Sequence, residues 1–130
     1  MKRIEFAASE ETVSREFPFL LTTGRALHQF NAGTMTRRTP NARLRETDTL
    51  NIAPVDAARL GLADGERVCI RSRHGEAAMP LKFDTRVKPG ELFATFHAAE
   101  VFLNHLTSPH RDNVVLTPEY KAVAVTVEKA

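Results

Sequence analysis

The chain has 130 residues, of which 42% are hydrophobic and 26% charged, with a formal net charge of +2 and one cysteine. This length predicts one domain with its own core, and no apolar run reaches the roughly 18 residues that a membrane helix needs. A single thiol excludes a disulfide framework or a four-cysteine metal or iron–sulfur site built by this chain alone. The N-terminal residues lack the pattern of a signal peptide, so we expect a cytoplasmic protein.

The charges are spread unevenly along the chain. No acidic residue lies between Glu16 and Glu46, although that segment contains five arginines. Such a segment attracts anions, and the planar guanidinium group suits two-point recognition of phosphate. The pattern predicts either an anion-binding site or a solvated basic loop whose charge is balanced by acids from elsewhere. The five residues are Arg25, Arg37, Arg38, Arg43 and Arg45.

The first predicted segment is an N-terminal arm. Residues 1–16 are polar and rich in Glu and Ser, which is typical of a flexible arm or linker, so we expect the domain to span residues 17–130. The apolar run from Phe17 predicts a buried strand that ends at Gly24, where the missing side chain permits a turn or the close approach of another group.

A short helix is predicted next. Residues 50–65 indicate a strand followed by a helix of about two turns that begins at Pro54 and ends at Gly61. Proline in the first turn, Asp56 near the N-terminal end and glycine just past Leu60 all favour this assignment.

The second half of the chain predicts further short strands. Alternating apolar and polar residues over 66–83 indicate a hairpin that turns at His74-Gly75, and another strand follows a Pro89-Gly90 turn. Residues 100–113 indicate a short helix and a loop, and residues 121–129 a final strand rich in valine. This order predicts a mainly β fold, a small barrel with one or two short helices at its rim.

Few residues are arranged for catalysis. His97, His105 and His110 are eight and five residues apart, which places no two on one helical face, so we predict no metal site. Cys69 lies among apolar strand residues, which favours a packed structural thiol over a nucleophile. The sequence lacks a nucleophile elbow, a phosphate loop and a dinucleotide fingerprint, so we assign no catalytic residue.

Residues 21–38 instead combine the features of a phosphate-binding segment. Gly24 and Gly33 let backbone amides approach an anion, and the neighbouring threonines and arginines supply hydroxyl groups and charge. His28 and Phe30 can flank a flat heterocycle. Taken singly, Gly24 can serve only as a turn, Phe30 as core and His28 as a surface ring, but together they predict anion or nucleotide binding. The threonines are Thr22, Thr23, Thr34 and Thr36.

This segment and four others resemble a known family in the same order along the chain. The stretches are LLTTGRALHQFNAGTMTRR, LNIAPVDAARLGLADGERVCIRSRHGE, RVKPGELFATFH, NHLT and PEYKAVAVTVE. They are similar to the C-terminal molybdopterin-dinucleotide-binding domain of the molybdenum and tungsten oxidoreductases, most of all to the formate dehydrogenase alpha subunit. The resemblance implies a six-stranded double-psi β-barrel with short rim helices.

The resemblance also implies a cofactor, molybdopterin guanine dinucleotide, whose molybdenum or tungsten is held by the pterin and not by this chain. The domain would bind and orient this cofactor without catalysing alone, with the upstream catalytic and iron–sulfur domains of the same enzyme as partners. The residues that the resemblance places along the cofactor are Thr23, Gly24, Arg25, Leu27, His28, Gly33, Thr34, Met35, Thr36, His97, Asn104, Tyr120 and Lys121.

Two other classes of function remain open at this point. A nucleic-acid-binding barrel would use the arginines between residues 37 and 45 along the phosphates, although only Phe30 is near enough to stack on a base. A protein-interaction barrel would need none of the cofactor residues. We favour the cofactor-binding domain, with no nucleic acid or membrane partner.

Overall fold

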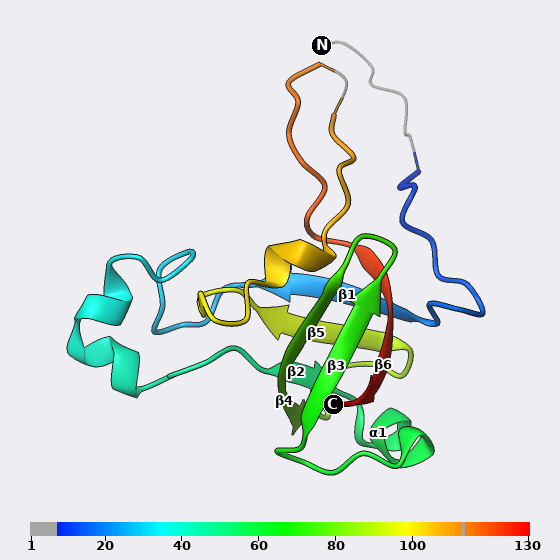
Figure 1. The fold of residues 1–130 in the computed structure, drawn as a ribbon, viewed down its shortest axis with the longest axis horizontal. Coiled ribbons are helices and arrows are strands. Elements are labelled where there is room, and N and C mark those ends of the chain that lie inside the picture. Colours follow the sequence, from blue (N-terminus) through cyan, green and yellow to red (C-terminus); the bar gives the residue numbers. More distant parts are fainter. Residues whose placement is uncertain (1–7, 113) are drawn as a thin grey trace.

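The computed structural model describes residues 8–112 and 114–130, which form a closed six-stranded barrel (Figure 1). The strand order is β1-β5-β2-β4-β3-β6; the β1–β5 and β2–β4 pairs are parallel and the other four are antiparallel. The mainly β, six-stranded barrel predicted from the sequence is confirmed. The strands are β1 (Phe19–Gly24), β2 (Leu50–Ile52), β3 (Arg67–Ser72), β4 (Glu76–Phe83), β5 (Glu91–Thr95) and β6 (Val123–Lys129).

Side chains from all six strands fill the interior of the barrel. Alternate residues of β1, β3 and β4 are buried, as the period of two in a strand requires. Burying a large aliphatic side chain contributes about 1.5–3 kcal/mol, so this interior supplies the main stabilisation of the domain. The largest fully buried members include Phe19, Leu21, Leu50, Ile52, Ile70, Met79, Leu81 and Leu92.

The helices are short, and none in the described part of the chain could cross a membrane. The predicted helix is confirmed as α1 (Pro54–Leu60), which ends at Gly61 in the left-handed conformation that glycine adopts without strain. Asp56 of α1 accepts a hydrogen bond of 2.7 Å from the Gly90 amide, which fixes the helix to the turn before β5. The other helical turns are η1 (Thr36–Arg38), η2 (Pro40–Arg43) and η3 (Leu103–Leu106).

The predicted hairpin is confirmed between β3 and β4. The Ser72 hydroxyl accepts hydrogen bonds from the His74 and Gly75 amides and so closes the turn. Gly75 lies against η3, where an added Cβ would stand 2.6 Å from the carbonyl oxygen of His105. The hairpin tip therefore supports the short helix that follows β5.

Part of the expected N-terminal arm packs on the barrel. Residues 1–7 lie outside the described residues, but Glu11 is buried against the hairpin tip and the start of β6. Its carboxylate lies 2.7 Å from Nε2 of His74, 3.5 Å from Nη1 of Arg73 and 3.2 Å from the Ala124 amide. Arg73 also stands over the ring of Phe17, 5.0 Å from its centre. The domain boundary at residue 17 stays a prediction.

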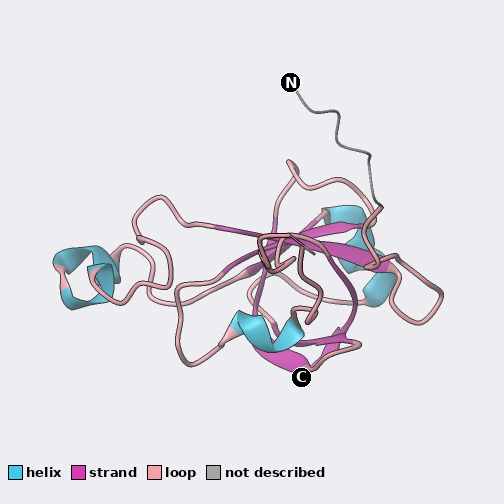
Figure 2. Ribbon diagram, turned by 90° about the horizontal axis from the view of Figure 1, so that it is seen from above, coloured by secondary structure: helices cyan, strands magenta, loops and turns pink. Residues whose placement is uncertain are grey.

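Two long connections leave the same end of the barrel. Because β1 and β5 are parallel neighbours, Gly24 pairs with Thr95 and the segments that follow begin side by side. Residues 25–47, which we call the lobe, carry η1 and η2 and project to the left in Figure 1. Residues 107–112 and 114–121, the arm, rise at the top of that view, and Figure 2 shows the lobe standing clear of the barrel.

Candidate functional site

A cavity of about 730 Å³ lies at this end of the barrel, between the lobe, the segment after β5, η3 and the arm. Its size is within the range of small-molecule sites, about 300–1,000 Å³. The lining combines four flat rings with amide and hydroxyl groups, so it can hold a heterocycle and donate hydrogen bonds to it. The lining residues are Asn31, Ala32, Thr34, Phe96, His97, Ala98, Ala99, Phe102, Leu103, Asn104, Thr107, Pro118 and Tyr120.

The base of the arm is fixed to the end of β1. The Thr23 hydroxyl donates a hydrogen bond of 2.7 Å to the Tyr120 carbonyl, and the Lys121 ammonium group donates one of 3.1 Å to the Thr23 carbonyl. The Lys121 ammonium group also lies 5.6 Å from the centre of the Phe96 ring. These contacts bring the predicted site residue Thr23 together with Tyr120 and Lys121, which lie 97 and 98 positions further along the sequence.

A buried glutamine organises the lobe. Gln29 is only 3% exposed, and its side-chain amide donates to the carbonyls of Asn41 and Arg45 while its oxygen accepts from the Thr36 hydroxyl at 2.6 Å. Gly33 has a φ of +72° and lies so close to the cavity wall that an added Cβ would stand 2.9 Å from the His97 carbonyl oxygen. The lobe therefore closes tightly against the segment that follows β5.

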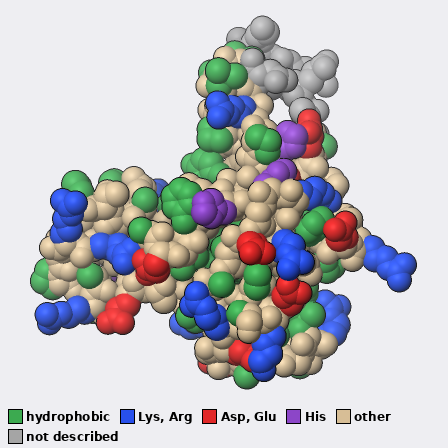
Figure 3. Space-filling view, in the orientation of Figure 1, with side chains coloured by type: hydrophobic (Ala, Val, Ile, Leu, Met, Phe, Trp, Pro, Cys, Tyr) green, Lys and Arg blue, Asp and Glu red, His purple; other side chains and the backbone are tan. Residues whose placement is uncertain are grey.

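The lobe also carries positive charge (Figure 3). Arg37 donates a hydrogen bond of 2.9 Å to Glu100 in the segment after β5. One of the five arginines is therefore paired with an acid from a distant part of the chain, as predicted for a basic loop whose charge is balanced by acids from elsewhere. Within the described part of the chain, no carboxylate lies within ion-pair distance of Arg25, Arg38 or Arg43. The lobe therefore keeps excess positive charge for an anion.

The structure brings some of the predicted contact residues to the cavity and leaves others away from it. Leu27 is 94% exposed and Met35 68% exposed on the lobe, while Arg25 and His28 are also exposed and do not line the cavity. Thr36 bonds to Gln29 inside the lobe, and Gly24 lies under the Phe93 ring. The predicted residues that line the cavity or contact its lining are Thr23, Gly33, Thr34, His97, Asn104, Tyr120 and Lys121. Their contacts with a cofactor stay predictions.

One important residue had no signal in the sequence. Asp48 is fully buried and accepts hydrogen bonds from the Thr95 hydroxyl and from the amides of His97 and Ala98, at 2.7, 3.0 and 2.9 Å. A lone aspartate before a short strand looks like any surface acid, because its partners are nearly fifty residues away. Its burial behind the cavity wall becomes visible only in the fold.

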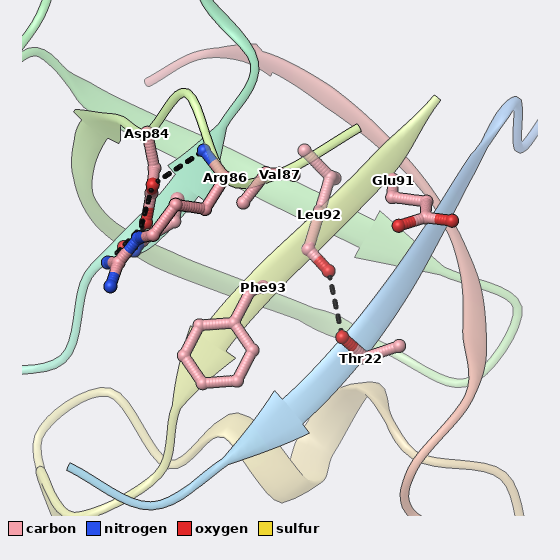
Figure 4. Close-up of a pocket in the computed structure, with 8 residues that line it drawn as sticks. Thr22, Asp84, Arg86, Val87, Glu91, Leu92 and Phe93 are labelled. Carbon is pink, nitrogen blue, oxygen red and sulfur yellow. Dashed lines mark hydrogen bonds and ion pairs between the residues drawn. The ribbon is translucent and has the colours of Figure 1, made fainter. Parts of the chain in front are cut away.

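A second, smaller cavity of about 390 Å³ lies beside β2 and β5 (Figure 4). Its Asp84 accepts hydrogen bonds from Asn51, from the side chain of Arg86 and from the Arg86 amide, all between 2.8 and 3.0 Å. The Arg86 side chain and amide hold the pKa of Asp84 well below its usual range. With its oxygens engaged in this way, the carboxylate closes the turn that follows β4.

Cys69 on β3 is half-buried, and burial together with the charges of Glu76 and Glu128 raises the pKa of its thiol. The reactive thiolate is therefore scarce at neutral pH. We expect iodoacetamide to modify Cys69 several-fold more slowly in the folded chain than in urea at the same pH, as measured by mass spectrometry over time. Equal rates would contradict the structural role of this thiol.

The chain is similar to known proteins over nearly its whole length. The family model described as "Molydopterin dinucleotide binding domain" matches residues 19–124. An F420-dependent formate dehydrogenase 1 subunit alpha from Methanococcus maripaludis is 37% identical over 97% of this chain, and an F420-dependent formate dehydrogenase subunit alpha from Methanocaldococcus jannaschii is 34% identical over the same share. A nitrate reductase from Symbiobacterium thermophilum is 36% identical over 92% of the chain.

Among solved structures, the acetylene hydratase from Pelobacter acetylenicus has the same fold, with a TM-score of 0.76 and 17% identity over 89% of this chain and 19% of its own. The chain likewise spans 19% of the length of both formate dehydrogenase subunits and 17% of the nitrate reductase. The barrel thus corresponds to one domain of much longer proteins. Because the family model covers most of the described barrel, the chain belongs to the family of molybdopterin dinucleotide binding domains.

Proposed function

We propose that this domain binds molybdopterin guanine dinucleotide and orients it within a larger enzyme of the formate dehydrogenase type. The observation that carries the proposal is the cavity between the lobe and the arm, at the end of the barrel where several predicted contact residues meet. Support also comes from the two formate dehydrogenase subunits, which are similar to nearly all of the chain. The bound cofactor supplies the redox-active metal, molybdenum or tungsten, through its pterin.

The residues at the cavity fit such a dinucleotide. Thr34 and Asn104 offer hydroxyl and amide groups to a ring or a sugar, and the rings of Phe102 and Tyr120 offer flat surfaces for stacking. Arg25 does not line the cavity, but its guanidinium lies 3.5 Å from Oδ1 of Asn31, which does, and it would supply charge for a diphosphate. Because Gly33 has no side chain, the lobe can approach the cavity wall at His97, and a Cβ at residue 33 would push the lobe away from that wall.

We further propose that other domains of the parent enzyme, including its catalytic and iron–sulfur domains, cover this end of the barrel. Large apolar side chains are exposed on both sides of the cavity, which is typical of a surface that another domain buries. The chain also spans only about a fifth of the length of its relatives, so most of the parent enzyme lies elsewhere. The exposed residues are Leu27, Phe30, Met35 and Leu44 on the lobe and Val114, Val115 and Leu116 on the arm.

An amide chemical-shift titration of the chain with GDP tests the proposal, because GDP carries the guanine and diphosphate of the expected cofactor. We expect shifts over residues 31–36, 96–104 and 118–121. Thr34→Ala, which removes an exposed hydroxyl from the cavity, should weaken GDP binding about fivefold, as the loss of one hydrogen bond predicts. Thr22→Ala is the matched control, because Thr22 is also exposed but faces the smaller cavity.

Two results would contradict the proposal. One is the absence of shifts at millimolar GDP together with unchanged cofactor content in a Thr34→Ala variant of the parent enzyme. The other is a set of shifts confined to the face of β2 and β5, around the smaller cavity, which would place the nucleotide site there.

A further inference from the structure

Two buried polar side chains, Asp48 and Gln29, are linked through His97 and the carbonyl of Arg45. Asp48 precedes β2 and belongs to the barrel, whereas Gln29 lies within the lobe. Neither lines the cavity. Asp48 nevertheless accepts hydrogen bonds from His97 and Ala98, which do line it. Gln29 bonds to other parts of the lobe, including Thr36, two positions after the lining residue Thr34.

On the barrel side, Asp48 fixes the segment after β5. Its two carboxylate oxygens accept the Thr95 hydroxyl and the amides of His97 and Ala98, and Oδ1 also lies 2.7 Å from Nδ1 of the His97 ring. His97 and Ala98 line the cavity, and the His97 side chain is 1% exposed. A fully buried carboxylate is stable only with such partners, so this arrangement resists local movement.

The carbonyl of Arg45 connects the two sides. It accepts a hydrogen bond of 3.2 Å from the Gln29 side-chain amide, and Nε2 of His97 lies 3.3 Å from the same oxygen. Gln29 in turn accepts the Thr36 hydroxyl, whose oxygen accepts the Phe30 amide. A continuous path of polar contacts therefore runs from Asp48 through His97, the Arg45 carbonyl and Gln29 to the loop that carries Gly33 and Thr34.

We propose that Asp48 and Gln29 are positioning residues that couple the conformation of the lobe to the cavity wall at residues 97–98. The ligand of the cavity rests on the proposed function, but the coupling does not, since its groups are all in this chain. Disturbing either end should change the environment of the other, although no hydrogen bond joins the two side chains. Ligand affinity should then fall because one wall of the site is no longer held against the other.

The first test is Asp48→Asn in the free chain, which removes the charge but keeps the shape of the side chain. We expect the amide signals of residues 29–36 on the lobe and the ring nitrogen signals of His97 to shift. Asp84→Asn is the matched control: it also replaces a carboxylate that accepts several hydrogen bonds, but one that lies at the smaller cavity. A purely local role for Asp48 would destabilise the fold and leave the lobe signals unmoved, which would overturn the proposal.

A reciprocal substitution on the lobe tests the coupling even if Asp48→Asn fails to fold. Gln29→Met retains the length of the side chain but removes its hydrogen bonds on the lobe. We expect the amides of His97 and Ala98 and the ring nitrogens of His97 to shift, although no hydrogen bond joins residue 29 to Asp48. Unmoved signals at those positions would also overturn the proposal.

GDP binding then separates this inference from the proposed function. Each variant should bind GDP about fivefold more weakly than the unaltered chain, while Asp84→Asn binds as the unaltered chain does. If GDP fails to bind the unaltered chain, the proposed function is in doubt, but the shifts in the free chain still decide the coupling. If GDP binds all variants equally, Asp48 and Gln29 do not position the site.

Discussion

Replacing Glu11 by alanine is expected to lower the free energy of unfolding by about 2 kcal/mol, because its buried carboxylate accepts hydrogen bonds from charged and backbone donors. The substitution leaves the buried amide of Ala124 without an acceptor and removes the partner of Arg73 and His74. Thermal or urea unfolding of the two chains measures the difference. Glu10→Ala is the control, because the Glu10 side chain is 73% exposed and its contact with His110 lies at the surface.

The effect of Glu11 should depend on pH in a defined direction. Burial raises the pKa of Glu11, but the hydrogen bonds from His74 and the Ala124 amide, with the charges of His74 and Arg73, outweigh burial and lower the pKa. A carboxyl group with a lowered folded pKa stabilises the protein fully above its ordinary pKa, about 4.3. That stabilisation is lost as the pH falls through the folded pKa.

The difference in stability between the unaltered chain and Glu11→Ala should therefore shrink as the pH falls below about 4. Measuring both chains over the same pH series isolates this group from the other carboxylates whose pKa values are lowered. A difference that does not shrink below about pH 4 would contradict the assignment. Stability equal to that of Glu10→Ala would show that residues 9–12 do not belong to the folded domain.

Gly33→Ala is expected to be the most damaging small substitution at the cavity. The residue has a φ of +72°, where an L side chain is strained by about 1–2 kcal/mol, and the added methyl group would also stand 2.9 Å from the His97 carbonyl oxygen. The lobe must then move away from the wall. We expect GDP binding to weaken more than tenfold, which corresponds to more than about 1.4 kcal/mol.

Gly65→Ala separates the strain at a positive φ from the contact with the cavity wall. Gly65 has a similar φ of +79°, but an added Cβ would meet no atom within 4 Å. This control should therefore show only the conformational cost, with GDP binding unchanged. Chemical-shift titrations of both variants give the comparison, and equal losses of affinity would mean that contact with the cavity wall is not the cause.

Local signals in the sequence were sufficient for most of the barrel. Pro54 and Gly61 mark the two ends of a helix, because proline fits the first turn and glycine adopts the left-handed conformation at the C-terminal end. Both effects act within one element. The hairpin at His74-Gly75 follows from alternation and a tight turn, which are also local. The order of such elements predicted a small, mainly β barrel, and the family resemblance implied its six strands.

The buried polar residues that hold the site and the barrel in place could not be predicted from local signals. Asp48 and Glu11 look like surface acids in sequence, because the amides that donate hydrogen bonds to their buried carboxylates are 49 to 113 residues away. The acid-free segment predicted an anion site, yet Arg37 pairs with Glu100, 63 positions further on. Buried polar contacts between distant segments depend on the closed barrel, so only the fold reveals them.

The strand order also governs how this domain can be made in the cell. β6 lies between β1 and β3, so the last of the six strands to be synthesised completes the barrel. Until β6 has emerged from the ribosome, the nascent chain carries two unpaired strand edges that can join other chains. The barrel therefore cannot close before β6 is available, and the pairing of β6 with β1 and β3 removes both exposed edges.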